Sequence, residues 1–122
     1  MKNCKFNELL GKTLSEITIS ESSIDFITNT GIAYSQYHEQ DCCENVWLDD
    51  YDGEITWLLG SEILQAEEVI DSKYNSEALE SITYSFYKLS TVKGSCTFNW
   101  RGESNGYYSE TVSLFVFNTT LE

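Results

Sequence analysis

The strongest signal for the fold lies in two short segments, Ile82-Thr83-Tyr84-Ser85-Phe86-Tyr87 and Cys96-Thr97-Phe98-Asn99-Trp100-Arg101. In both, large apolar side chains alternate with polar ones, which is the period of a strand with one face against a core. Residues 92–95 lie between them and have the composition of a turn. The two segments therefore predict an antiparallel hairpin.

Alternation also assigns side chains to the two faces of this hairpin, because successive residues of a strand point to opposite sides. We expect a core face made of Cys96, Phe98 and Trp100 with Ile82, Tyr84 and Phe86. The opposite face then collects Thr97, Asn99 and Arg101, with Thr83, Ser85, Tyr87, Ser109, Thr111 and Ser113. Such a face suits hydrogen bonding to a polar small molecule or packing against another subunit. A plain solvated face is the alternative.

The rest of the chain extends this pattern. Further strands are predicted at residues 14–19, 24–28, 32–34, 63–70 and 107–117, the last one following the hairpin as a third strand. Residues 4–10 and 54–60 are expected to form short helices that end at glycine, and residues 49–53 a loop. We predict the α+β class, a mainly antiparallel β-sheet with hairpins and one or two short helices.

Length and composition indicate one folded domain over residues 1–122, since the chain has no proline and no linker-like stretch. A hydrophobic fraction of 41% argues against disorder in spite of a net charge of −13. No apolar run approaches the ~20 residues that span a bilayer, and no secretory signal is visible. We expect a cytoplasmic protein whose four cysteines are reduced.

The charges are unevenly distributed along the chain. Residues 1–80 hold 17 Asp and Glu against four lysines, a balance of −13, whereas residues 81–122 hold three acids against Lys88, Lys93 and Arg101, a balance of zero. Seven cations against twenty acids leave no basic stripe for DNA or RNA. An anionic small ligand is tolerated only in the last third of the chain, around its single arginine.

Arg101 and the residues after it therefore form the candidate binding segment. An arginine can hold a phosphate or a carboxylate with two hydrogen bonds. Ser104, Asn105 and Gly106 are expected to form a turn whose side chains and backbone amides can surround an anion.

Two tyrosines follow this turn. Tyr107 and Tyr108 are expected to point to opposite faces, so that one of them can stack on a base. The alternative for the whole segment is an ordinary hairpin loop with an ion pair between Arg101 and Glu103 or Glu110.

The segment from His38 to Glu44, His-Glu-Gln-Asp-Cys-Cys-Glu, has metal-binding residue types but an unsuitable spacing. Structural zinc sites use cysteines two to four residues apart, and adjacent cysteines on an extended chain point apart. We expect no metal here, with Cys42 and Cys43 as buried free thiols and His38 bonded locally. A cysteine nucleophile paired with His38 lacks a third orienting residue. The acidic run at residues 49–54 lacks the alternating ligands of a calcium loop.

Several segments occur in the order found in a family of small phage and prophage proteins. They are residues 38–44, 59–61, 66–68, 86–88, 91–94 and, most specifically, 101–110, which read Arg-Gly-Glu-Ser-Asn-Gly-Tyr-Tyr-Ser-Glu. On these segments, residues 36–118 resemble that family and, through it, the first-described phage anti-Thoeris proteins.

The resemblance implies binding rather than catalysis, with no cofactor. Proteins of that kind sequester cyclic ADP-ribose isomers made by bacterial immune sensors without cleaving them, and some also hold cyclic oligonucleotides. They are oligomers with pockets at subunit interfaces and act in the cytoplasm of the infected bacterial host. The resemblance assigns the phosphate to Arg101 and the turn amides, hydroxyls to Asn99, Ser104 and Asn105, and the base to Tyr107, Tyr108, Phe86 or Trp47.

Two other functions stay open. An acidic DNA mimic, or another protein-binding inhibitor of a host defence protein, would use the −13 surface, with residues 38–71 as its functional region and Arg101 dispensable. A small hydrolase acting on nucleotides ranks third, because one histidine and no recognised nucleophile motif give few catalytic groups.

Overall fold

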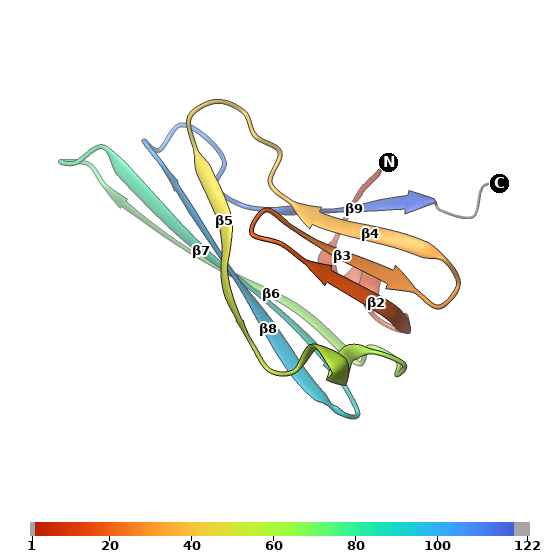
Figure 1. The fold of residues 1–122 in the computed structure, drawn as a ribbon. Coiled ribbons are helices and arrows are strands. Elements are labelled where there is room, and N and C mark those ends of the chain that lie inside the picture. The colour runs from red at the N-terminus through yellow and green to blue at the C-terminus, as the bar shows by residue number, and fades with distance from the viewer. Residues whose placement is uncertain (1, 119–122) are drawn as a thin grey trace.

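The computed structural model describes residues 2–118, which form two antiparallel β-sheets packed face to face (Figure 1). The five-stranded sheet has the order β1 Lys2–Cys4, β9 Ser113–Asn118, β4 Ile32–Tyr37, β3 Ser23–Thr28, β2 Leu14–Ile19. The four-stranded sheet has the order β5 Asn45–Asp52, β8 Gly94–Ser104, β7 Glu80–Thr91, β6 Gln65–Asn75. The predicted mainly antiparallel β-sheet is confirmed.

Within residues 2–118 the helices are two single turns of 3-10 helix, η1 Phe6–Leu9 and η2 Ile55–Leu58. They lie where the sequence predicts short helices, and each ends as its C-cap amide donates to a carbonyl three residues back. Each turn places apolar side chains in the core, Phe6 and Leu9 from η1 and Leu58 from η2. The two turns therefore add to the core and contribute little regular structure.

The core lies between the two sheets. Cys96, Phe98 and Trp100 of β8 are buried, as the alternation of this strand predicts. The Phe98 ring meets the Phe26 ring of β3 edge to face, with centroids 6.0 Å apart. Trp100 Nε1 donates a hydrogen bond to Gln36 Oε1 of β4 at 2.9 Å. These contacts join the two sheets through their centres.

The faces of β7 differ from the prediction. The turn at Val92 and Lys93 pairs Thr91 with Gly94, so odd-numbered residues of β7 stand opposite even-numbered residues of β8. The core face of β7 therefore consists of Thr83, Ser85, Tyr87, Leu89 and Thr91, and its outer face of Ile82, Tyr84, Phe86 and Lys88. The expected assignment was wrong because it followed the hydrophobicity of β7 and ignored the parity that a two-residue turn imposes.

Two other segments also correct the prediction. Residues 49–52 belong to β5 rather than to a loop, with a register shift between Leu48 and Asp50. Residues 105–112 form no strand, and the chain then enters β9, which pairs with β1 and β4 of the other sheet. The expected third strand at 107–117 is thus replaced by a crossover, which leaves Ser109 and Thr111 outside any sheet face.

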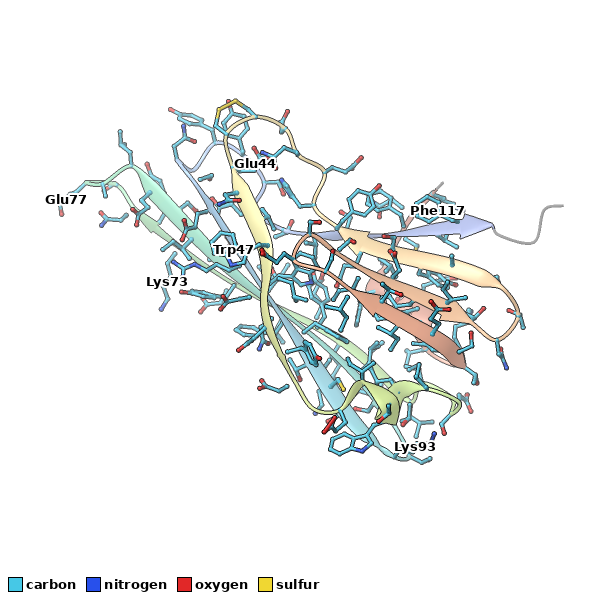
Figure 2. All side chains as sticks on the ribbon, in the orientation of Figure 1. Glu44, Trp47, Lys73, Glu77, Lys93 and Phe117 are labelled. Carbon is cyan, nitrogen blue, oxygen red and sulfur yellow. A yellow bond between two sulfur atoms is a disulfide. The ribbon has the colours of Figure 1, made fainter. Side chains whose placement is uncertain are left out.

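The β6–β7 hairpin is long and projects beyond the five-stranded sheet (Figure 1). Its strand β6 forms one edge of the four-stranded sheet, has 11 residues, and is exposed from Glu67 onward. Figure 2 shows Glu77 at the far tip of this hairpin and Lys93 at the opposite end of the sheet. The hairpin therefore offers a long open edge.

Candidate functional site

The outer face of the four-stranded sheet brings four of the predicted site residues together. Trp47 of β5 stands opposite Arg101 of β8, and Asn99 of β8 stands opposite Phe86 of β7. The surface formed by Trp47, Tyr84, Phe86, Asn99, Arg101 and Glu103 is called the Arg101 face below. It is turned away from the five-stranded sheet, because the intervening residues of β7 and β8 are the ones buried in the core.

Arg101 lies between two aromatic rings on this face. Its guanidinium carbon is 5.7 Å from the centroid of the Trp47 ring and 5.5 Å from that of Tyr84. Both distances fall within the ~6 Å range of cation–π attraction. The arginine also donates from Nε and Nη2 to one oxygen of Glu103, at 3.0 and 2.6 Å. This ion pair is one of the two alternatives that the sequence left open.

The ion pair orients Arg101 without using the whole side chain. The hydrogen bond to Glu103 is the main reason why the pKa of Arg101 is raised, so the guanidinium keeps its charge. The side chains of Arg101 and Glu103 are 31% and 39% exposed. Because the pair does not use Nη1, an acceptor on a ligand can still be bound there.

Asn99 and Phe86 form the next row of the Arg101 face. Asn99 Nδ2 donates to Asp50 Oδ1 at 2.5 Å, which leaves its carbonyl oxygen as an acceptor for ligand hydroxyls. Phe86 is partly buried and has Val69 of β6 opposite it on its other side. The Arg101 face therefore combines aromatic rings, a cation and an amide.

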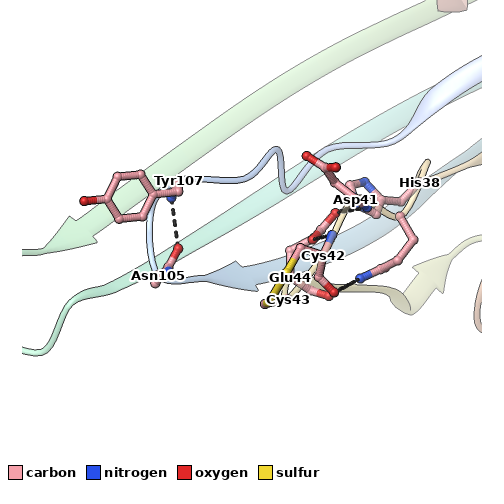
Figure 3. The surroundings of a disulfide bond; sticks show 8 residues. His38, Asp41, Cys42, Cys43, Glu44, Asn105 and Tyr107 are labelled. Carbon is pink, nitrogen blue, oxygen red and sulfur yellow. Dashed lines mark hydrogen bonds and ion pairs between the residues drawn. A yellow bond between two sulfur atoms is a disulfide. The ribbon is translucent and has the colours of Figure 1, made fainter.

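The turn after β8 does not form the expected anion cradle. The amide of Gly106 donates to the Ser104 hydroxyl at 2.9 Å. The amide of Tyr107 donates to Asn105 Oδ1 at 3.1 Å (Figure 3). Two amides that were expected to hold a ligand are thus already bonded within the loop. Ser104 and its loop lie at the end of the Arg101 face, and Tyr107 is 86% exposed.

Glu110 explains why Ser104 turns inward. Its buried carboxylate accepts hydrogen bonds from Thr83 at 2.7 Å, from Ser81 at 3.1 Å and from Ser104. A Cβ atom on Gly102 would collide with the Glu110 backbone carbonyl. Glu110 thus anchors the 105–112 loop under β7 and β8, and it is not the ion-pair partner of Arg101.

Two of the segments that carry the family resemblance, residues 38–44 and 101–110, approach each other at this end of the sheet. His38 Nδ1 lies 2.7 Å from the carbonyl oxygen of Thr111 in the 105–112 loop, and His38 Nε2 lies 2.7 Å from Glu44 Oε2. Glu44 also accepts from the backbone amides of Asp41 and Cys42, at 2.7 and 2.9 Å (Figure 3). The His38–Glu44 segment is therefore a closed loop held by one buried carboxylate.

These hydrogen bonds lower the pKa of Glu44. Burial alone raises the pKa of a carboxyl group, but the amides of Cys42 and Asp41 and the His38 ring together lower the pKa of Glu44 to about 2. Glu44 is therefore ionised throughout the neutral range and keeps the loop closed.

The cysteines differ from the expectation in part. Cys42 and Cys43 are exposed and joined by a disulfide bond between adjacent residues, whereas free buried thiols were predicted (Figure 3). Cys4 and Cys96 are free. Within residues 2–118 no group of three or more His, Cys, Asp or Glu side chains is arranged to hold a metal ion.

Sequence reasoning missed Tyr84 of the Arg101 face, whereas the ion pair of Arg101 with Glu103 was one of its alternatives. Tyr84 was assigned to the core. The sequence does indicate the position of Tyr84. Any turn with an even number of residues between segments 82–87 and 96–101 places an even-numbered residue of β7 opposite Arg101. The rings on both sides of Arg101 follow from that register.

Fold and site together define a two-sheet antiparallel β-domain whose exposed sheet face holds an arginine between two aromatic rings. Among residues 2–118, no helix is long and apolar enough to cross a membrane. The chain belongs to the family described as a domain of unknown function (DUF7448), whose profile matches residues 7–114. Searches of the curated proteins and of the solved structures found no match for this chain.

Proposed function

We propose that this protein binds and sequesters a nucleotide-type small-molecule signal on the Arg101 face, without cleaving it. The observation that carries the proposal is the position of Arg101 between Trp47 and Tyr84 on an outer sheet face. Aromatic rings and guanidinium planes stack on bases, and guanidinium groups bind phosphates. The face thus offers both kinds of contact side by side.

The chemistry of the face fits such a ligand in three steps. A base stacks on the rings of Trp47 or Phe86, because aromatic stacking contributes ~1–3 kcal/mol per base. A phosphate accepts from the guanidinium edge of Arg101 that Glu103 leaves open. Ribose hydroxyls reach the carbonyl of Asn99. The loop after β8 contributes only to the rim of the proposed site, through Ser104, Asn105, Gly106, Tyr107 and Tyr108.

The engagement of His38 supports binding without turnover. Both ring nitrogens of the chain's single histidine face acceptors, the Thr111 carbonyl and the Glu44 carboxylate. A histidine in this arrangement stabilises a loop and is poorly suited to moving protons for a substrate.

The resemblance to phage anti-Thoeris proteins suggests the identity of the signal. We propose a cyclic ADP-ribose-type molecule, with cyclic oligonucleotides as further ligands, bound in the cytoplasm of an infected bacterium. Such molecules carry the phosphates, hydroxyls and bases for which the Arg101 face has partners.

The open edge of β6 supports the proposed homo-oligomer. Val69, Ile70 and Tyr74 on this strand are 60%, 46% and 56% exposed, and an unpaired apolar edge favours pairing with another strand. Antiparallel pairing of β6 with a second copy, centred on Ile70, aligns all 11 residues and places Glu67 opposite Lys73 twice. Centring on Val69 would oppose Glu67 and Asp71, and centring on Asp71 would oppose two aspartates. Charge complementarity therefore favours the Ile70 register.

A depletion experiment tests the function. Pure protein is incubated with a lysate in which the Thoeris sensor has been activated, then washed and heated, and the supernatant is assayed for signal. Recovery of intact, active signal is the expected result. Destroyed signal would indicate an enzyme. A lysate that keeps its signal would contradict both sequestration and cleavage.

The second candidate is an acidic inhibitor of a host defence protein. One observation favours it, because edge strand β5 exposes Asp49, Asp50 and Asp52 in a row beside the Arg101 face. Replacing Asp49 and Asp52 with asparagine, which keeps the hydrogen bond from Asn99 to Asp50, separates the candidates. If the Arg101 face is the site, the variant still depletes the signal. If the acidic row is the site, the variant loses anti-defence activity and depletion of the signal does not change.

A further inference from the structure

We infer that the protein has a second binding site, a cavity between the sheets that takes a neutral, hydroxyl-rich molecule of nucleoside or disaccharide size. The cavity has a volume of about 500 Å³, within the ~300–1,000 Å³ typical of small-molecule sites. It lies where edge strand β1 and the start of η1 face β6 and β7, so it does not include the Arg101 face. The inference does not depend on the proposed function.

The buried wall of the cavity contains a hydroxyl that makes no well-directed hydrogen bond within residues 2–118, although the Glu68 carboxylate lies close to it. It belongs to Tyr87, which is 1% exposed and lines the cavity. A buried hydroxyl without a well-directed hydrogen bond is destabilising, so its retention calls for a compensating role. Its position in the cavity wall makes that role ligand binding.

The Glu68 carboxylate lies near this hydroxyl at the more exposed side of the cavity. Burial, and then Glu68, raises the pKa of Tyr87 well above its ordinary value, so the phenol keeps its proton as a donor. The carboxylate does not meet the hydroxyl with the geometry of a hydrogen bond. A ligand hydroxyl can accept from Tyr87 and donate to Glu68 at the same time, which neither an ammonium group, having no acceptor, nor a fully ionised phosphate, having no donor, can do.

The remaining polar lining favours a neutral ligand. Asn3 and Asn7 add carboxamides, which both donate and accept, and the charges of Lys5 and Glu68 are opposite. An anionic ligand would meet Glu68 and a protein of net charge −13. Hydroxyl groups match every one of these partners without adding charge.

Cys4 provides a reporter inside the cavity. It is a free, half-buried thiol of the lining, whereas Cys96, the other free thiol, is 1% exposed in the core. Burial, and then Glu8, raises the pKa of Cys4, so its alkylation is slow enough to follow by mass spectrometry at mildly alkaline pH. Occupation of the cavity should slow this reaction.

The experiment uses adenosine and cellobiose as the two neutral probes, with AMP and spermidine as charged comparisons. We expect saturable binding of at least one neutral probe by calorimetry, at least severalfold slower alkylation of Cys4 in its presence, and weaker protection of Cys4 by both charged compounds. Binding of adenosine but not of cellobiose would identify a nucleoside site, and binding of cellobiose but not of adenosine would identify a saccharide site.

Two variants make the test specific. Tyr87→Phe should weaken binding about tenfold, while its melting temperature stays equal to or above that of the wild type because an unsatisfied hydroxyl is removed. Glu68→Gln should weaken binding by a similar factor. Tyr51→Phe, at a site outside the cavity, should leave binding unchanged.

Four results would overturn the inference. They are no binding of either neutral probe at millimolar concentration, binding that leaves Cys4 alkylation unchanged, stronger protection of Cys4 by AMP than by adenosine, and a lower melting temperature for Tyr87→Phe. The last result would assign the hydroxyl a structural role instead.

Discussion

Arg101 and Tyr84 occupy opposed positions on β8 and β7, and the guanidinium carbon lies 5.5 Å from the centroid of the tyrosine ring. With Trp47 on the other side, the arginine is held in place before any ligand arrives. Preorganisation of this kind lowers the entropic cost of binding.

Arg101→Ala should abolish depletion of the signal, with a loss of binding of about 30- to 100-fold, because a charge-assisted hydrogen bond and a stacked cation disappear together. The fold should remain, since an exposed ion pair contributes little to stability. Calorimetry with the purified signal and circular dichroism check the two parts. Lys88→Ala, on the same outer face, is the matched control. Unchanged binding by the Arg101 variant would remove this residue from the site.

The ionised Glu44 should make stability depend on pH in the acidic range. Its pKa is about 2 in the folded protein against a reference value of 4.5, so its stabilising effect is complete above pH 4.5 and is lost as the pH falls toward 2. Thermal melts from pH 6 to pH 2 should therefore show a steeper decline for the wild type than for Glu44→Gln. At pH 7 the variant should melt at a lower temperature. Parallel curves for the two proteins would contradict this account of Glu44.

The hydrogen bond between Trp100 and Gln36 should contribute strongly to stability, because it joins the sheets in a buried region. Trp100→Phe removes the donor and leaves space, and we expect a loss of about 2–4 kcal/mol in the free energy of unfolding. Adding Gln36→Leu to this variant should recover part of the loss, since the orphaned amide is removed. Trp57→Phe, at a 40% exposed ring, should cost less than about 1 kcal/mol. Chemical denaturation measures all three.

The sequence predicts the mainly antiparallel fold well, because alternation in residues 82–87 and 96–101 is a local property. It does not predict which sheet a strand joins. After β8 the chain crosses to the other sheet and forms β9, because Glu110 is fixed beneath Ser81 and Thr83. These contacts join residues that are 27 to 29 positions apart in the sequence. Arg101 could be selected from charge alone, whereas Tyr84 required the register of the hairpin. The cavity beside Tyr87 depends on residues from five separate segments and had no local signal.

The disulfide between Cys42 and Cys43 predicts a specific thiol count. Protein unfolded in denaturant without reductant should take up two iodoacetamide groups, on Cys4 and Cys96, and four after reduction. Denaturant is needed because Cys96 is buried in the folded state. Peptide mapping should place the two additional groups on Cys42 and Cys43. Four groups without reductant would show that the loop carries free thiols, as the sequence alone suggested.

Charge exchange on β6 tests the proposed homo-oligomer. In the register centred on Ile70, Lys73→Glu places Glu67 of one copy opposite a glutamate of the other, twice, so light scattering should show a shift from twice the 14.0 kDa chain mass toward that mass. Glu67→Lys alone should have the same effect, because it opposes two lysines. The double variant, Glu67→Lys with Lys73→Glu, restores both ion pairs with reversed polarity and should restore the dimer. A wild type that stays monomeric at high concentration, or a Lys73→Glu variant that stays dimeric, would reject this interface. Recovery in the double variant is the decisive result, since neither change in net charge nor misfolding of single variants explains it.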